Sequence, residues 1–201
     1  MASILADYRH HDMETARLLS LCQTLGDLTP VHQKLVGEII HLRLFSLFEN
    51  LASSVVSKLA CGAPYADGTG PALLQRATSI QNARGLFKTL GRTRPVHQPR
   101  WSTASEIKDN IKFVIDPGDN VHRVLDANAS LIDEMRRVRN RVAHNNPTSR
   151  ENYRQVVRSH YGASPNHVTP GLLLVTPRFS PPLVEQYIKK QRIIAKDLVK
   201  A

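Results

Sequence analysis

The hexapeptide Arg139-Asn140-Arg141-Val142-Ala143-His144 carries side chains that could act on a phosphodiester. Arg139 offers a permanently charged, planar set of donors that fits phosphate oxygens, including those that gain charge during phosphoryl transfer. His144 titrates near pH ~6.5 when unperturbed, so it can act as a general acid or base around neutrality. We interpret Arg139 and His144 as a candidate catalytic pair.

An amphipathic helical segment precedes this hexapeptide. Apolar side chains recur at helical spacing from Val121 to Val142, and Asn128 interrupts the stripe. The hexapeptide is followed by Asn145-Asn146-Pro147, and a proline disfavours helical geometry in the residue before it. We therefore expect His144 at or near a helix C-terminus, where unpaired carbonyl groups favour a protonated imidazole.

The spacing within the pair limits what one regular helix can do. Five helical steps separate Arg139 and His144 by roughly 140° around the axis and about 7.5 Å along it. Either the helix end unwinds or a second chain completes the site. Asn140 lies four residues before His144 on the same face and could hold its ring in one tautomer. Arg136 extends this polar row at the same spacing.

The pattern Arg139-Asn140-x-x-x-His144 resembles the signature of the HEPN superfamily, and the run from Leu44 to Leu51 is similar to the long second helix of such domains. The resemblance covers roughly residues 30 to 160. It implies an all-α, antiparallel helical bundle that dimerises through its motif helices. It also implies a metal-independent endoribonuclease without a cofactor. Many relatives are toxins or anti-phage effectors, which implies RNA as the substrate and a cognate inhibitor protein as a further partner.

The resemblance also assigns roles to single residues. Arg139 and His144 would be the catalytic pair, and Asn140 the polar residue that usually follows the Arg. Some relatives carry, two residues after the His, a Tyr that a nucleotidyltransferase modifies; Asn146 stands there, so this mode of silencing is not expected. Other relatives are catalytically silent, so a helical module that binds nucleic acid or a partner protein is the alternative. Arg139 and His144 would then only stabilise the helix C-terminus through favourable interaction with the helix dipole.

The charge of the chain favours a polyanionic partner such as RNA. Lys and Arg number 27 against 17 Asp and Glu, for a formal net charge of +10. The candidate RNA-binding residues lie in and just after the motif: Arg136, Arg137, Arg141, Asn145, Arg150 and Arg154. Arg150, Arg154 and Arg158 recur every four residues, as either a phosphate-tracking stripe or a solvated helix face. Trp101, the sole tryptophan, fits a core anchor better than a base-stacking platform.

Glu49 stands between Phe48 and Leu51 in an otherwise uncharged stretch. A buried carboxylate is costly without a donor. Glu49 could therefore support the site by pairing with Arg139 or a neighbouring Arg across the bundle. The alternative is a solvent-facing residue beside Asn50.

Length and composition predict one globular domain over residues 1–201, since 41% of the residues are hydrophobic. Cys22 and Cys61 lack CxxC spacing and are expected as free thiols in a reducing cytosol. The sequence shows no apolar run of ~20 residues, which favours a cytoplasmic protein without membrane association. The run His10-His11-Asp12 lacks the spacing of zinc ligands, so no metal site is predicted.

The expected elements form a helical bundle with an irregular, Pro-rich segment at 162–182 before a C-terminal helix. Thr29 and Pro30 should start the longest helix, and Thr103-x-x-Glu106 and Thr148-x-x-Glu151 should start two others. Residues 172–175 could form one strand. The other helices are expected at 13–25, at 71–90 with a break near Thr78 or Gly85, at 121–142 and at 183–199.

Overall fold

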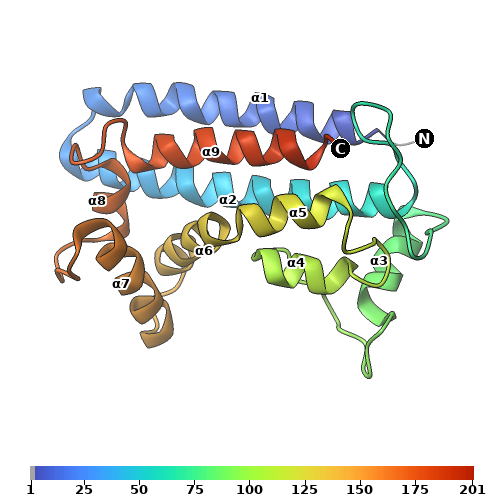
Figure 1. The fold of residues 1–201 in the computed structure, drawn as a ribbon. Coiled ribbons are helices and arrows are strands. Elements are labelled where there is room, and N and C mark those ends of the chain that lie inside the picture. Colours follow the sequence, from blue (N-terminus) through green and yellow to red (C-terminus); the bar gives the residue numbers. More distant parts are fainter. Residues whose placement is uncertain (1–2) are drawn as a thin grey trace. The chain divides into compact units, whose positions relative to one another are not determined.

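The protein is all-helical, as the sequence predicted. The computed structural model describes residues 3–201, which contain nine α-helices, one short 3-10 helix (Leu25–Asp27) and one isolated β-bridge between Leu73 and Ile115. The α-helices (Figure 1) are α1 (Ile4–Gln23), α2 (Pro30–Ala60), α3 (Ile80–Thr89), α4 (Ala104–Ile111), α5 (Asn120–Ala127), α6 (Ala129–Ala143), α7 (Pro147–Tyr161), α8 (Pro170–Val175) and α9 (Leu183–Leu198).

The chain divides into two compact units. One contains the residues up to Asp12, Phe48–Ile132 and Ile193–Ala201, and the other contains Met13–Leu47 and Asp133–Arg192. The helices α1, α2, α6 and α9 each supply residues to both units. The single-domain organisation stays a prediction.

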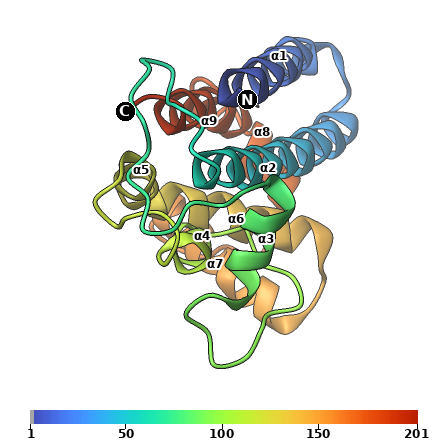
Figure 2. The ribbon, with the colours of Figure 1, turned by 90° about the vertical axis from the view of Figure 1, so that its right-hand side faces the viewer.

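In the first unit, α3, α4 and α5 are grouped around the C-terminal part of α2 (Figure 2). Its core includes Leu59 of α2, Ile107 of α4 and Leu125 of α5, each fully buried. The carboxylate of Asp119 caps α5 by accepting from the N–H of Val121 at 3.0 Å. The same carboxylate accepts from the Tyr65 hydroxyl, and this bond ties the connection after α2 to the start of α5.

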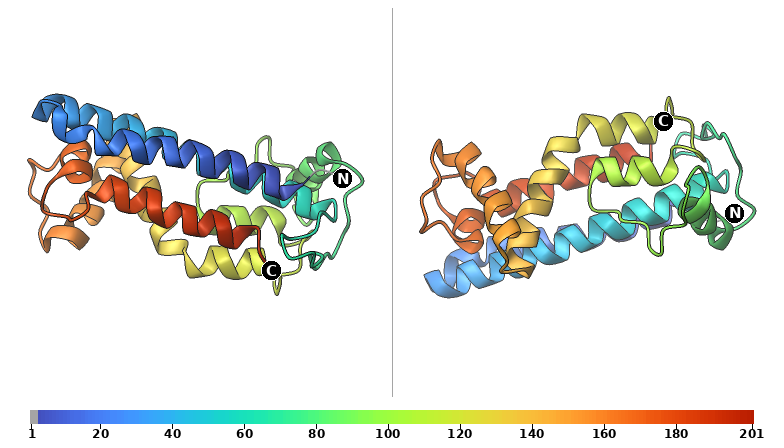
Figure 3. Two further views of the ribbon diagram at one scale, coloured as in Figure 1. Left: turned by 90° about the horizontal axis from the view of Figure 1, so that it is seen from above. Right: turned by 90° about the horizontal axis from the view of Figure 1, so that it is seen from below.

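In the second unit, the first part of α9 runs alongside α1 and α2 (Figure 3). The short helix α8 lies against α2, because the Gly171 N–H donates to Glu38 Oε1 at 2.8 Å and a Cβ on Gly171 would stand 2.7 Å from the Lys34 carbonyl oxygen. Gln191 of α9 donates to the Leu44 carbonyl at 2.9 Å. Backbone proximity and side-chain hydrogen bonds therefore both hold this unit together.

The first helix begins at Ile4, not near Met13 as expected. Ile4, His11, Thr15 and Cys22 share one buried face of α1. Two of these four positions are polar, so the sequence lacks the regular spacing of apolar residues that would have indicated a helix before Met13. His11 is consequently a helical, buried residue.

Residues 71–79 are irregular, although the sequence predicted a helix from 71 to 90. Leu74 N–H instead donates to the Val114 carbonyl at 2.9 Å, and Leu73 forms its bridge with Ile115. The helix α4 ends at Ile111, and the residues that follow it take part in this pairing. The expected cap of α4 is confirmed, since Thr103 Oγ1 accepts from Glu106 N–H at 3.0 Å.

The expected continuous motif helix is two helices, α5 and α6, separated at Asn128. The Asn128 amide donates to the Val124 carbonyl at 2.9 Å, so a side chain competes for a backbone acceptor at this point. The helix α7 begins with Asn146 as its cap and Ser149 as the reciprocal partner, not with Thr148 and Glu151. Residues 172–175, expected as a strand, belong to α8.

One helix of the described residues is long and apolar enough to cross a membrane. The most apolar stretch of α2 has a mean hydropathy of 1.3, and 56% of that stretch is buried inside the protein. The core helix of a globular fold has the same properties. The cytoplasmic location stays a prediction.

Candidate functional site

His144 directly follows the last residue of α6, as predicted. Its backbone N–H donates to the Asn140 carbonyl at 2.9 Å, so helical bonding extends to His144, while its side chain is exposed. Buried Ser149 of α7 donates from Oγ to the His144 carbonyl at 2.6 Å. The backbone of His144 is thus fixed between two helices, and its imidazole is accessible to a ligand.

Arg139 is half-buried and is oriented by its sequence neighbour. Its Nη1 donates to Asn140 Oδ1 at 3.1 Å. This bond differs from the expected one, in which Asn140 holds the ring of His144. Within the second unit, as far as the structure describes it, no carboxylate lies at ion-pair distance from Arg139. The positive charge of the guanidinium is therefore not neutralised by a carboxylate of this unit and is available to an incoming anion.

Arg136 and Arg137, both predicted to bind RNA, share one carboxylate. Asp133 Oδ1 lies 2.8 Å from Arg136 Nη2, and Asp133 Oδ2 lies 2.6 Å from Arg137 Nη2. Arg137 also donates to Gln155 of α7. These two guanidiniums are largely committed within the protein. The missed partner was detectable, since Asp133 stands three and four residues before them, at helical contact spacing.

The other predicted RNA-binding residues are exposed or half-exposed around the connection between α6 and α7. Asn145 Oδ1 accepts from Arg141 Nη1 at 2.8 Å and from Arg150 Nε at 3.2 Å, which brings two guanidiniums to one neutral oxygen. Arg154 pairs with Glu151 at 3.3 Å. Arg158, the third member of the stripe, is exposed. The cluster of Arg141, Asn145 and Arg150 fits a phosphate better than Arg154 does.

Glu49 belongs to the first unit, whereas Arg139 belongs to the second. Glu49 is half-buried on α2 and lines a pocket with Arg84 and Lys88 of α3. Support of Arg139 by Glu49 stays a prediction.

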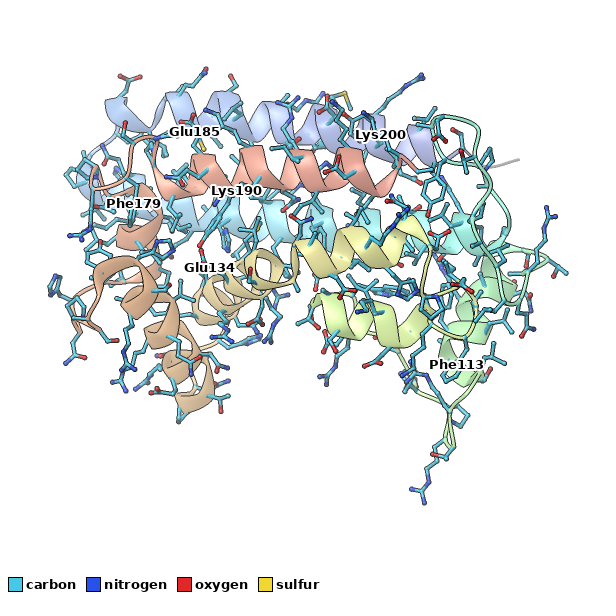
Figure 4. All side chains as sticks on the ribbon, viewed as in Figure 1. Phe113, Glu134, Phe179, Glu185, Lys190 and Lys200 are labelled. Atoms are coloured by element: carbon cyan, nitrogen blue, oxygen red, sulfur yellow. The ribbon has the colours of Figure 1, made fainter. Side chains whose placement is uncertain are left out.

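A polar network that the sequence did not reveal holds α6 in place. Glu134 accepts from the Tyr187 hydroxyl at 2.6 Å and pairs with His160 Nε2 at 3.0 Å. Burial acts to raise the pKa of Glu134, but these two hydrogen bonds and nearby Lys190 lower it on balance below its ordinary value (Figure 4). Glu134 therefore joins α6 to α7 and α9 as an ionised carboxylate.

His41 of α2 adds a second buried link to α6. Its Nε2 bonds to the Met135 carbonyl at 2.9 Å. Burial lowers the pKa of His41 to about 4, so the ring is neutral at physiological pH. The other ring nitrogen, Nδ1, is buried without a hydrogen-bond partner among the described residues.

Free thiols are confirmed for Cys22 and Cys61. Across residues 3–201, no group of three or more His, Cys, Asp and Glu side chains is placed to hold a metal ion. The metal-independent character of the predicted reaction stays a prediction.

Comparison of the chain with protein-family models, curated proteins and solved structures finds no match. The resemblance to the HEPN superfamily therefore rests on the sequence alone, on residues 139–144 and on the run from Leu44 to Leu51.

Proposed function

We propose that this protein is a metal-independent endoribonuclease in which Arg139 and His144 act on the scissile phosphate. The observation that carries the proposal is their setting at the end of α6. His144 is exposed, and Arg139 is oriented by the neutral oxygen of Asn140 rather than by a carboxylate. Acid–base catalysis with charge stabilisation requires an accessible imidazole and a guanidinium whose charge no carboxylate neutralises.

The reaction is attack of a ribose 2′-oxygen on the adjacent phosphorus, in line with the leaving 5′-oxygen. One group removes the 2′-proton as the new P–O bond forms, and another protonates the 5′-oxygen as its bond to phosphorus breaks. The products are a 2′,3′-cyclic phosphate and a 5′-hydroxyl. Arg139 stabilises the charge that develops on the phosphoryl oxygens.

These proton transfers require two groups, and each chain brings one His to the motif. A second copy that contributes its own His144 supplies the missing acid or base, so we infer a homodimer formed through the motif helices. The cluster of Arg141, Asn145 and Arg150 would bind flanking phosphates. An enzyme that cuts RNA without a cofactor fits a toxin or anti-phage effector restrained by an inhibitor protein.

One observation favours the alternative, a catalytically silent module that binds a partner protein. Val31, Leu35 and Ile39 follow one another at four-residue spacing on α2 and are 73%, 53% and 53% exposed. Apolar rows of this kind are commonly buried against a partner. In that case Arg139 and His144 would have only a structural role.

Incubation with RNA in excess EDTA separates the two functions. Wild-type protein should cut, and Arg139→Ala and His144→Ala should each lower the rate by about 10²–10⁴-fold. Exposed His167 and Arg9 provide matched controls, and His167→Ala and Arg9→Ala should cut at the wild-type rate. The absence of cleavage of any tested RNA by the wild type would favour the module. A strict monomer that still cuts RNA would contradict the shared site.

A further inference from the structure

A large pocket lies wholly within the first unit, in residues that the proposed reaction does not use. Its volume is about 1250 Å³. It is lined by α2, α3, the loop from Arg92 to Ser102 and α4. Most of this lining is polar or charged, so the pocket suits a hydrophilic ligand.

The loop that forms one wall is fixed by hydrogen bonds. Asn110 of α4, only 8% exposed, accepts from Arg92 Nη2 at 2.7 Å and donates from Nδ2 to the Arg100 carbonyl at 2.6 Å. Val96 N–H donates to the Lys88 carbonyl at 3.0 Å. One buried amide thus holds both ends of the loop, and the wall exists before any ligand binds.

Gly91 places the start of this loop. It has a φ of +68°, and a Cβ there would stand 2.3 Å from the ring of Phe113, which lies after α4 (Figure 4). A side chain would be strained by the backbone and would also clash with that ring. The sequence therefore specifies the position of the wall.

Three cationic side chains of the pocket, those of Arg84, Lys88 and Arg92, are not neutralised by a carboxylate. Arg84 and Lys88 stand four residues apart on α3, and within the part of the chain that the structure describes neither has a carboxylate at ion-pair distance. Among the described residues, Arg92 donates to three neutral oxygens: the backbone carbonyls of Phe87 and Asp109 and the side-chain amide oxygen of Asn110. Such a row attracts a phosphate group.

The carboxylates of the pocket are partly occupied elsewhere. Glu106 lies 3.7 Å from Arg100 and accepts from Ser102 at 2.7 Å. Asp109 pairs with Lys112 at 2.9 Å. The remaining oxygens of Glu106 and Asp109 leave acceptors for hydroxyl or amino groups of a ligand, while the row of Arg84, Lys88 and Arg92 remains positive.

Trp101 contributes an aromatic surface to the same pocket. Trp101 is half-buried and its indole forms a T-shaped contact with the ring of Phe87, with ring centroids 5.8 Å apart and an interplanar angle of 74°. Packing against the core, the role expected for Trp101, therefore accounts for only part of its ring surface. An indole beside cations is the combination that binds a base and its phosphate.

We propose that this pocket binds a nucleotide, with the base on Trp101 and the phosphate at Arg84, Lys88 and Arg92. The nucleotide is either free or one unit of an RNA strand. The site involves neither Arg139 nor His144, which belong to the other unit. It is therefore independent of the proposed cleavage reaction.

Fluorescence of Trp101, the only tryptophan of the chain, reports directly on this pocket. The full chain is titrated with AMP, with UMP, with inorganic phosphate and with a short oligoribonucleotide. The oligoribonucleotide titration uses His144→Ala, so that RNA is bound but not cut. We expect saturable quenching, with AMP or UMP active if the ligand is free and only the oligoribonucleotide active if it is RNA.

Charge substitutions establish where the ligand lies. Arg84→Gln with Lys88→Gln should weaken the affinity at least about tenfold. Arg94→Gln removes an exposed cation of the same loop that does not line the pocket, and should leave the affinity unchanged. The proposal is overturned if neither nucleotides nor RNA quench Trp101, if inorganic phosphate competes as strongly as a nucleotide, or if the two variants behave alike. Quenching in His144→Ala distinguishes this result from any failure of RNA cleavage.

Discussion

Nη1 of Arg139 lies 3.1 Å from Oδ1 of Asn140, so a guanidinium and a neutral amide of neighbouring residues hold each other. A neutral acceptor orients a cation without cancelling its charge. By contrast, Arg136 and Arg137 share the carboxylate of Asp133. On the same helix, Arg136 and Arg137 therefore form ion pairs within the protein, whereas the charge of Arg139 is available to a ligand.

This relationship predicts different outcomes for two substitutions at Asn140. Asn140→Ala removes the orienting acceptor and should lower kcat/KM for RNA by about tenfold. Asn140→Asp puts a carboxylate beside Arg139 and should lower kcat/KM by about 10²-fold or more, because the cation is then neutralised. Steady-state cleavage of a fluorogenic RNA measures both. Equal rates for the two variants would show that the charge of Arg139 is not used.

The outer arginines predict a difference in salt dependence. Arg154 pairs with Glu151, whereas Arg158 is exposed and has no such partner among the described residues. Arg158→Gln should therefore reduce the slope of log affinity for RNA against log salt by about one, and Arg154→Gln should reduce it less. RNA affinity measured across a salt series provides the slopes. Identical slopes in wild type and both variants would remove α7 from the RNA-binding surface.

Much of the fold was predictable because its signals are local. The cap at Thr103 and the stop after His144 depend on residues within a few positions of each helix end. The breaks that were missed depend on partners distant in sequence or on single side chains. Leu74 forms its hydrogen bond with Val114, forty residues away, and Asn128 divides a helix through one amide.

The site was predictable to a similar degree. The end of α6 just before His144 follows from the sequence pattern, whereas the bond from Asn140 to Arg139 depends on rotamers that spacing cannot specify. Glu134 was not identified, because its partners His160 and Tyr187 come from two other helices. A carboxylate in an amphipathic helix resembles a solvated residue until the tertiary structure is known.

His41 makes the protein sensitive to acid. Burial lowers its pKa to about 4, while the same residue in the unfolded chain titrates near ~6.5. As the pH falls from about 6.5 to about 4, the unfolded state binds the proton and the free energy of unfolding decreases. His41→Leu should abolish this contribution, since the Met135 carbonyl keeps its helical partner.

Urea denaturation at pH 7 and pH 5 tests the role of His41. The loss of stability between the two should be smaller in His41→Leu than in wild type by about 2 kcal/mol. Equal losses would show that His41 is not the responsible group. His167→Ala, which alters an exposed histidine, serves as the control and should retain the wild-type pH dependence.

The Glu134 network predicts a pH dependence of its own. Its folded-state pKa is lowered, so its stabilising contribution is present above the unfolded value near ~4.3 and is lost as the pH falls through the folded value. Tyr187→Phe removes one donor and should cost about 1–2 kcal/mol at pH 7. The difference from wild type should shrink below pH ~4. A constant difference at all pH values would indicate that Tyr187 stabilises the core only by packing.

The chemical ends of cleaved RNA test the central claim most directly. In excess EDTA, wild-type protein should leave 2′,3′-cyclic phosphates and 5′-hydroxyls, and His144→Ala should leave the RNA intact under the same conditions. Ends with a 3′-hydroxyl and a 5′-phosphate, or the same cyclic ends at the same rate from His144→Ala, would contradict the account.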